Sequence, residues 1–239
     1  MLAVLSGSGT YGLGKLKEEY NTMTPYGDAI VNIVSVGKKE ILFVPRHGKN
    51  HVHPPHKIGY RANIFALNKL GATAVLGTYA CGVISKFKVG DIVLLKDFIG
   101  MEMPITFFDD FSSGIRHTDF TEPFDKRLSK LVEESAAIHR ITLKKGGVIK
   151  TTCGPRFETK AEISMYKKLG INLVSMTAAH EIILMKEMEI PFVGLGIGTN
   201  LACGIGKRPL SHKEVVDLME KKNGQLELIV KELAIFITD

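Results

Sequence analysis

The chain has 239 residues, of which 45% are hydrophobic and 23% charged, and its formal net charge is +6. These values fit one large α/β domain, or at most two small ones, and they exclude a disordered or low-complexity protein. No basic run is interleaved with aromatic residues and no apolar run reaches the roughly 18 residues of a membrane span, so we expect no nucleic-acid and no membrane partner.

Short apolar and β-branched segments recur along the chain and predict strands, because each has strand length and most are bounded by Gly, Pro, Asn or Asp. Several are apolar throughout, which is typical of strands buried on both faces of a mixed or parallel sheet. In chain order the expected strands are Leu2–Leu5, Ala29–Val36, Glu40–Val44, Ala74–Thr78, Asp91–Leu95, Gly147–Thr152, Leu173–Met176 and Pro191–Thr199.

Segments with helical periodicity lie between these strands. Lys15 and Lys17 belong to the scattered lysines that alternate with acids, and we expect them on a solvated helix face. Thr121 is a candidate cap for the second helix, and Ser211 with Glu214 has the spacing of a capping box. The expected helices are Tyr60–Leu70, Pro123–Ile138, Thr159–Leu169, Ala178–Met188 and Ser211–Ile237.

The alternation of strands and helices predicts an α/β fold: a single domain over residues 1–239, with a central mixed β-sheet flanked by helices. The stretch Ile99–Thr118 has no clear periodicity and is expected to be a long loop, which in a compact domain is often functional.

Three cysteines, Cys81, Cys153 and Cys203, give an odd number without metal-ligand spacing. We therefore expect small buried apolar side chains in a reducing compartment rather than disulfides. The N-terminus opens directly into the strand-like run Leu2–Leu5 without a basic leader, so the sequence predicts a cytoplasmic protein.

The first expected strand runs into the segment 6–10 (Ser-Gly-Ser-Gly-Thr), whose glycines let backbone N–H groups approach an anion and whose hydroxyls add donors. A tight turn after a strand explains this segment about as well. Arg46 and His47 end another strand, at the edge where open α/β sheets bind ligands. Because Arg presents a planar fork to phosphate and His adds a donor, these two residues are either phosphate ligands or an ordinary surface pair.

A histidine-rich loop follows, with His51, His53 and His56 around Pro54 and Pro55. The spacing fits no zinc pattern, and no cysteine or carboxylate completes a ligand set, so we expect no metal site. The two prolines predict a stiff loop that can hold the wall of a binding site.

Three further segments carry residues suited to a flat polar ligand. The segment 78–82 (Thr-Tyr-Ala-Cys-Gly) ends in small residues that let backbone amides approach a ligand. Phe157 can stack on a ring and Glu158 can accept from ring N–H groups, although Glu158 also fits a carboxylate at a helix start. Asn200 ends an otherwise apolar strand and offers both a donor and an acceptor, although an ordinary turn also explains it.

In this order and at these separations, the segments resemble the trimeric nucleoside phosphorylases, the family of purine nucleoside phosphorylase and methylthioadenosine phosphorylase. The similarity runs from Leu2 to about the final helix. Its most specific parts are Arg46-His47-Gly48, Tyr60-Arg61-Ala62-Asn63-Ile64, Gly154-Pro155-Arg156-Phe157-Glu158-Thr159, and Met176-Thr177 followed by His180-Glu181.

The resemblance implies a phosphate site and a nucleoside site. For phosphate it implies the hydroxyls of Ser8 and Thr177, the side chains of Arg46 and His47, the backbone N–H of Ala80, and Tyr79, which departs from the family's usual Thr or Asn. For the nucleoside it implies Met176 under the ribose, His212 at the 5′-hydroxyl, and, around the base, Phe157, Glu158, Asn200 and Ala202.

The same resemblance implies a reaction without a metal ion or organic cofactor, with inorganic phosphate as co-substrate. Cleavage of the glycosidic bond builds positive charge on the sugar and negative charge on the purine. Phosphate held by Arg46, His47 and backbone amides faces the sugar carbon, and Asn200 stabilises the leaving base. Asn200 and His47 are therefore the candidate catalytic residues.

Adenine-specific members share an Asp-x-Asp pair where this chain reads Asn200-Leu201-Ala202. An anionic Asp accepts the amino group of adenine but repels the keto oxygen of hypoxanthine or guanine, whereas Asn200 can donate to that oxygen and Glu158 can accept from the ring N–H. A mismatched polar group in a dry pocket costs roughly 1–3 kcal/mol, enough to discriminate.

The resemblance therefore implies a purine nucleoside phosphorylase that converts inosine or guanosine to free base and ribose 1-phosphate. The alternatives are a phosphorylase of S-methyl-5′-thioinosine or S-methyl-5′-thioadenosine, a nucleoside hydrolase, and a non-catalytic nucleotide-binding module. Family members assemble as homotrimers or homohexamers, with a neighbouring subunit completing the pocket. Phe107, Phe108 and His117 are candidates for that contribution.

Overall fold

One nine-stranded sheet organises the part of the chain that the structure, a computed structural model, describes: residues 1–10, 12–101, 103–112, 114–206 and 209–238. Its strands are β1 (Leu2–Ser6), β2 (Lys15–Thr24), β3 (Gly27–Val36), β4 (Lys39–Pro45), β5 (Ala74–Val83), β6 (Ile92–Ile99), β7 (Leu143–Thr151), β8 (Leu173–Ser175) and β9 (Phe192–Leu201). They lie in the order β2-β3-β4-β1-β5-β8-β7-β6-β9, with both parallel and antiparallel neighbours. The predicted mixed sheet is confirmed.

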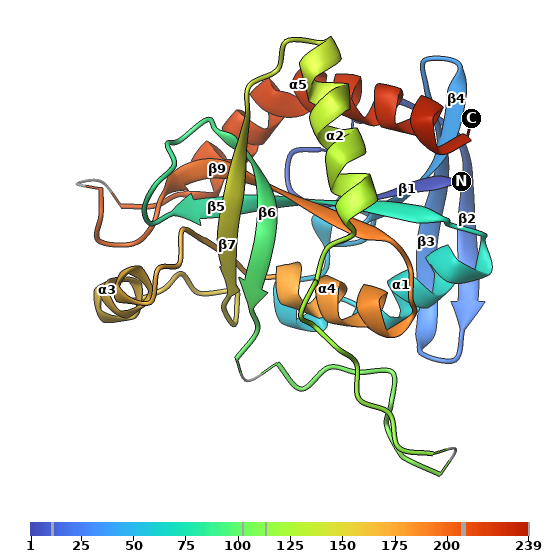
Figure 1. Ribbon diagram of the computed structural model, residues 1–239, viewed down its shortest axis with the longest axis horizontal. Coiled ribbons are helices and arrows are strands. Elements are labelled where there is room, and N and C mark those ends of the chain that lie inside the picture. Colours follow the sequence, from blue (N-terminus) through green and yellow to red (C-terminus); the bar gives the residue numbers. More distant parts are fainter. Residues whose placement is uncertain (11, 102, 113, 207–208, 239) are drawn as a thin grey trace.

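The second half of this sheet closes on itself. Strand β5 pairs with β1 near its start, with β8 at its end and with β9 along most of its length. Strand β9 also pairs with β6, and the pairs β6–β7 and β7–β8 complete the ring. Strands β5 to β9 therefore form a small closed barrel, and β1 to β4 extend from it as an open wing (Figure 1).

Helices cover both faces of the sheet, as predicted (Figure 1). The helices are α1 (Tyr60–Lys69), α2 (Lys126–Ile138), α3 (Lys160–Lys168), α4 (Ala178–Glu187) and α5 (His212–Thr238), with 3-10 turns η1 (Lys49–His51) and η2 (Pro55–Lys57). Helices α1 and α4 pack together on one face, and α2 and α5 on the other. Each pair encloses its own hydrophobic core against the sheet, while α3 covers a third, smaller cluster at the end of the barrel.

Local capping chemistry sets several helix starts. Thr159 caps α3 in a full capping box, in which its side chain accepts from the backbone N–H of Glu162 and the Glu162 side chain accepts from the backbone N–H of Thr159. Ser211 accepts from the N–H of Glu214, as the spacing predicted. The expectation that Thr121 caps the second helix is wrong, because the helix begins later and the carboxylate of Asp125 accepts from the N–H of Leu128.

The sequence missed one strand, β2. The lysine-rich segment around Lys15 and Lys17 was expected on a helix face, but it forms an edge strand that pairs only with β3 in the described part of the sheet. Its residues are largely exposed, so the apolar alternation that marks a strand is absent. The predicted long loop is present, since the described residues between β6 and α2 form no helix or strand.

The cysteine environments differ from the expectation. Cys81 is buried, but Cys153 is exposed and Cys203 partly exposed, and all three thiols are free. No helix within the described ranges combines the length and the apolar character needed to cross a lipid bilayer.

Candidate active site

A cavity of about 470 Å³ opens at the carboxyl ends of β1, β4 and β9 and gathers most of the predicted site residues. Strand β5 and the β8–α4 junction form its floor, and the start of α5 forms one wall. The predicted residues that line it are Ser8, Arg46, His47, Ala80, Phe157, Glu158, Met176, Thr177, Asn200 and His212. Residues from opposite ends of the sequence are thus brought to one site, as strand ends in open α/β sheets commonly are.

The glycine loop after β1 lies against the Arg46–His47 pair. A Cβ atom on Gly7 would lie 2.8 Å from Nη1 of Arg46 and 3.3 Å from Cδ2 of His47, so only glycine allows this approach. The buried Ser6 hydroxyl hydrogen-bonds with Thr10 and, at 2.5 Å, with Thr78 on β5. These bonds fix the loop to the neighbouring strand and leave Ser8 lining the cavity.

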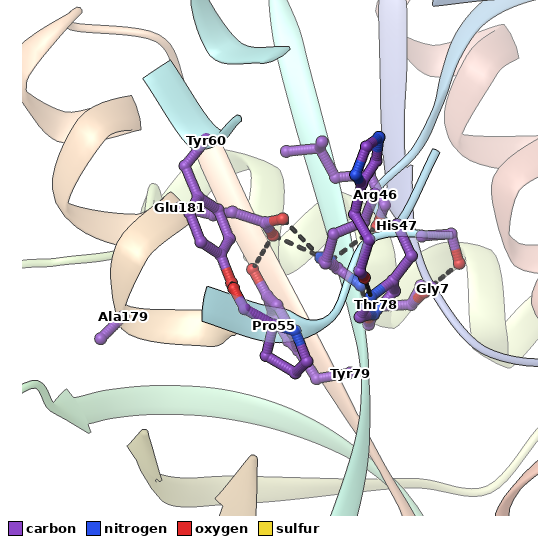
Figure 2. Close-up of polar contacts among 12 residues, drawn as sticks. Gly7, Arg46, His47, Pro55, Tyr60, Thr78, Tyr79, Ala179 and Glu181 are labelled. Atoms are coloured by element: carbon purple, nitrogen blue, oxygen red, sulfur yellow. Dashed lines mark hydrogen bonds and ion pairs between the residues drawn. The ribbon is translucent and has the colours of Figure 1, made fainter. Parts of the chain in front are cut away.

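Arg46 does not present its fork to the cavity as the sequence suggested; the fork holds Glu181 of α4 instead (Figure 2). Nε of Arg46 donates to Oε1 of Glu181 at 2.5 Å and Nη2 donates to Oε2 at 2.8 Å. Further donation from Nη2 to the Leu5 carbonyl and from Nη1 to the Thr78 carbonyl ties the group to β1 and β5. The second N–H of Nη1, beside Gly7, remains for an anion.

Burial explains this arrangement. Both side chains are almost inaccessible, at 2% for Arg46 and 1% for Glu181, and a buried guanidinium requires a carboxylate partner. Although burial opposes the charge on Arg46, the charge of Glu181 and the hydrogen bonds to it raise the pKa of the guanidinium above its ordinary value. The ion pair therefore keeps the Arg46 guanidinium charged at the back of the cavity, with Glu181 as its counter-charge.

Tyr79 belongs to this buried layer and does not reach the cavity. Along β5 the side chains alternate, so that Thr78 and Ala80 line the cavity while Tyr79 points to the other face. Its hydroxyl donates to Oε2 of Glu181 at 2.8 Å, and its ring lies beneath the Arg46 guanidinium. The expectation that Tyr79 binds phosphate is therefore corrected: its side chain positions the ion pair.

His47 is held at the cavity wall in a neutral state. Its Nδ1 lies 2.8 Å from the carbonyl oxygen of His53, and the ring of His51 stacks on it at 4.1 Å. The ring of His212, from α5, lies 5.6 Å from that of His51. Burial, followed by the charge of Arg46 and the neighbouring imidazoles, lowers the pKa of His47 to about 3.

Thr177 and Met176 enter the cavity at the start of α4. Thr177 is the N-cap residue of this helix, but its side chain makes no capping hydrogen bond. The first N–H groups of a helix carry partial positive charge and favour an anion nearby. The hydroxyl of Thr177 is thus placed between a helix N-terminus and the cavity.

Phe157, Glu158 and Asn200 line the side of the cavity formed by the end of β9 and the turn before α3. Oε1 of the buried Glu158 accepts from the Thr152 hydroxyl at 2.8 Å, which leaves Oε2 for a ligand. Oδ1 of Asn200 accepts from the Thr199 hydroxyl at 2.8 Å, and Nδ2 donates to the Leu201 carbonyl at 3.0 Å. The amide orientation is therefore fixed, with one N–H of Nδ2 still available.

Ala202 is not part of this cavity. It is buried in the small cluster under α3 with Val174 and Ile84, and it borders a second, neighbouring cavity. The expectation that Ala202 contacts the base is therefore corrected: Ala202 follows the end of β9, where the chain has left the strand, and its side chain packs into this cluster. Phe107, Phe108 and His117 lie on the loop after β6 and do not line the cavity of their own chain either.

Sequence reasoning missed several residues of the site. Glu181 was noted only as part of a motif, although a carboxylate inside an apolar helix signals a buried partner. Val215 and Met219 of α5 also line the cavity, and so does Ser175, whose buried Oγ has no hydrogen-bond partner within the described ranges. The stiff Pro54–Pro55 wall is present. Among the described residues, no three His, Cys, Asp or Glu side chains are grouped so that they could hold a metal ion.

Comparison with known proteins places this cavity in a family. A family model described as the phosphorylase superfamily matches residues 1–235. A relative from Moorella thermoacetica, named "Probable 6-oxopurine nucleoside phosphorylase", is 40% identical over 97% of this chain and 91% of its own. A relative from Methanopyrus kandleri, named "Probable S-methyl-5'-thioinosine phosphorylase", is 38% identical over 92% of this chain and 86% of its own.

A solved structure agrees with these relatives. A variant of the adenosine/methylthioadenosine phosphorylase from Schistosoma mansoni, in complex with methylthioadenosine, superimposes with a TM-score of 0.90 at 27% identity, covering 99% of this chain and 91% of that one. The matches span the whole cavity and both halves of the sheet. The chain therefore belongs to the phosphorylase superfamily and, within it, to the nucleoside phosphorylases, enzymes that transfer a pentosyl group to phosphate.

Proposed function

We propose that this enzyme cleaves 6-oxopurine nucleosides, inosine and guanosine, with inorganic phosphate to give the free base and ribose 1-phosphate. The observation that carries the proposal is the orientation of the Asn200 amide, in which Nδ2 donates to the Leu201 carbonyl and Oδ1 faces the Thr199 hydroxyl. The remaining Nδ2 N–H is a donor, which suits the keto oxygen of a 6-oxopurine and opposes the amino group of adenine. Oε2 of Glu158 supplies an acceptor for the ring N–H.

The phosphate would occupy the end of the cavity where donors converge. Nη1 of Arg46, the hydroxyls of Ser8 and Thr177, and the N-terminus of α4 surround this position. An anion held there would face the sugar carbon as positive charge develops on it, while Asn200 stabilises charge on the leaving base. The proposed reaction needs no metal ion and no organic cofactor, because the two charges of the transition state are met by phosphate and by protein donors.

The group at the sugar 5′ position separates this proposal from its alternative. His212 lines the cavity and can hydrogen-bond a 5′-hydroxyl, but Val215 and Met219 line the same wall and would suit a methylthio group. The alternative is therefore a phosphorylase of S-methyl-5′-thioinosine or S-methyl-5′-thioadenosine, and it places Asn200 and Arg46 in the same roles.

The test is the steady-state kcat/KM on inosine, guanosine and both methylthio substrates, measured with and without phosphate. We expect turnover only with phosphate, and a preference for inosine and guanosine. Product formed without phosphate would indicate a hydrolase, and a wide preference for adenine-containing substrates would contradict the base assignment. Tight binding without turnover would indicate a non-catalytic module.

A substitution tests the observation itself. Asn200→Asp places a carboxylate beside the keto oxygen, so kcat/KM on inosine is expected to fall at least tenfold, the equivalent of ~1.4 kcal/mol, with some gain on adenosine-type substrates. Asn68→Asp makes the same chemical change on the exposed face of α1 and should leave both activities unaltered. Equal preferences in the wild type and Asn200→Asp would remove Asn200 from the base site.

We also propose that the enzyme is a cytoplasmic homotrimer or homohexamer. The free thiols support a reducing compartment. The apolar side chains of Met101, Phe111 and Ile115 are exposed on the loop after β6, which supports a subunit contact there. Light scattering at several protein concentrations should give the mass of three or six chains, and a monomer would contradict the assembly.

A further inference from the structure

The orientation of the His47 ring is fixed by a hydrogen bond in which the ring must be the donor. Nδ1 lies 2.8 Å from the carbonyl oxygen of His53, and a carbonyl oxygen can only accept, so Nδ1 carries the hydrogen. In the neutral ring Nε2 then carries a lone pair. His47 therefore presents an acceptor to the cavity, not the donor that an anion site usually offers.

The surroundings of His47 oppose a second proton on the ring. The ring is buried, with a relative exposure of 7% for the residue. The charged Arg46 precedes it in the chain, His51 stacks on one face at 4.1 Å, and His212 from α5 adds a third imidazole. Glu181 of α4 does not offset these charges, because it is paired with Arg46. Consistent with this arrangement, burial first and these charges second lower the pKa of His47 to about 3.

Nε2 of His47 lies beside the available donor, Nη1 of Arg46. The point where a Cβ on Gly7 would lie is 3.4 Å from Nε2 of His47 and 2.8 Å from Nη1 of Arg46. None of the described residues donates a hydrogen bond to Nε2. An acceptor and a donor thus stand side by side above the glycine loop.

We propose that His47 reads a proton on the bound anion, so that the site selects an oxyanion carrying an O–H group over one that carries none. Inorganic phosphate at neutral pH always retains at least one O–H, which would donate to Nε2 while its other oxygens accept from Arg46 and the hydroxyls. Sulfate is similar in size and charge but has no proton to donate. This inference rests on the proposed function, which makes phosphate the co-substrate, and it adds the feature that distinguishes phosphate from other tetrahedral anions.

The direct test is titration calorimetry of the purified enzyme with inorganic phosphate and with sulfate. At pH 7 we expect phosphate to bind at least tenfold more tightly, because sulfate would leave a lone pair facing a lone pair. Sulfate affinity should rise by about tenfold for each pH unit of acidification, since sulfate needs the rare protonated form of His47. Phosphate affinity should change much less over the same range.

A matched pair of variants assigns the effect to the ring. In His47→Gln the amide can turn its N–H towards the anion, so the preference for phosphate over sulfate should fall below threefold. His56→Gln removes an exposed imidazole outside the cavity and should retain the full preference. Circular dichroism of both variants establishes that they fold, and if His47→Gln does not fold, the pH dependence of the wild type decides.

The outcomes separate this inference from the proposed function. Phosphorolysis of inosine together with equal affinities for phosphate and sulfate at pH 7 would overturn the inference alone. Sulfate affinity in the wild type that does not rise between pH 8 and pH 6 would do the same. No phosphate binding and no phosphorolysis would overturn both.

Discussion

Replacing Glu181 with glutamine would remove the negative partner of a guanidinium that has almost no access to water. Glutamine has the same shape, and its oxygen can still accept from Nε of Arg46. Its amide nitrogen, however, would face Nη2 of Arg46 and the hydroxyl of Tyr79, both of which are donors to the carboxylate in the native site. The change therefore leaves the buried Arg46 charge unpaired and places the N–H groups of the new amide against the donors of Arg46 and Tyr79.

The magnitude follows from the burial. Removing one partner of a buried ion pair costs about 3–5 kcal/mol, a large part of the roughly 5–15 kcal/mol that stabilises a typical domain. For a chain of this size, this corresponds to a fall in Tm of about 6–20 °C. Because the position of Nη1 also depends on the pair, we expect the KM for phosphate to rise while the KM for nucleoside changes little.

Equilibrium unfolding in urea at a fixed protein concentration measures the first effect, and phosphate saturation curves measure the second. Tyr79→Phe removes one hydrogen bond to the same carboxylate and should cost about 1.5 kcal/mol. Tyr60→Phe removes a bond to the neutral Pro55 carbonyl, 2.9 Å long, and should cost about 1 kcal/mol. A loss below about 1 kcal/mol for Glu181→Gln, with an unchanged KM for phosphate, would refute the reasoning.

Three further outcomes follow from the same geometry. Burial lowers the pKa values of His47 and His180 in the folded state, so the folded state resists protonation of these rings. Their contribution to the unfolding free energy is fully present above about pH 6.5 and should fall on acidification, by up to about 1.4 kcal/mol per pH unit for each ring. Urea unfolding between pH 7 and pH 5 measures this loss. Gly7→Ala forces a methyl group against the guanidinium and should raise the KM for phosphate at least tenfold, whereas Gly12→Ala, with open space around its Cβ, should not. Asp125→Ala removes the cap of α2 and should lower the unfolding free energy by about 1 kcal/mol without changing kcat/KM.

Much of the fold could be predicted because the inner strands are apolar throughout and the helices carry clear stop signals. Helix α3, for example, runs between a threonine that forms a capping box and Gly170, which has a positive φ of 78°. Strand β2 was missed because its residues are largely exposed, so its sequence lacks the alternation of apolar and polar residues that predicts a strand. The closure of β5 to β9 into a barrel depends on pairings between strands distant in sequence, such as β5 with β9, which no local pattern encodes.

The sequence predicted which residues line the site better than it predicted how their side chains are oriented. The residue types at the strand ends identified Arg46, His47 and Asn200, all of which line the cavity. The sequence did not reveal that the Arg46 fork faces inward, since that depends on Glu181, 135 positions away. It also could not distinguish Tyr79 from Ala80, because one residue of strand register moves a side chain to the opposite face of the sheet.

The guanidinium of Arg46 makes its hydrogen bonds to β1, β5 and α4, segments separated from it by 41, 32 and 135 positions in the chain. The anion site is therefore assembled from these three segments and from the end of β4, which Arg46 follows. Until all four segments dock, the guanidinium has no fixed position and the glycine loop has no packing partner. Affinity for phosphate should therefore arise in a single step with the native state. Phosphate should accordingly act as a folding ligand, raising the unfolding temperature in proportion to the logarithm of its concentration once the site is saturated.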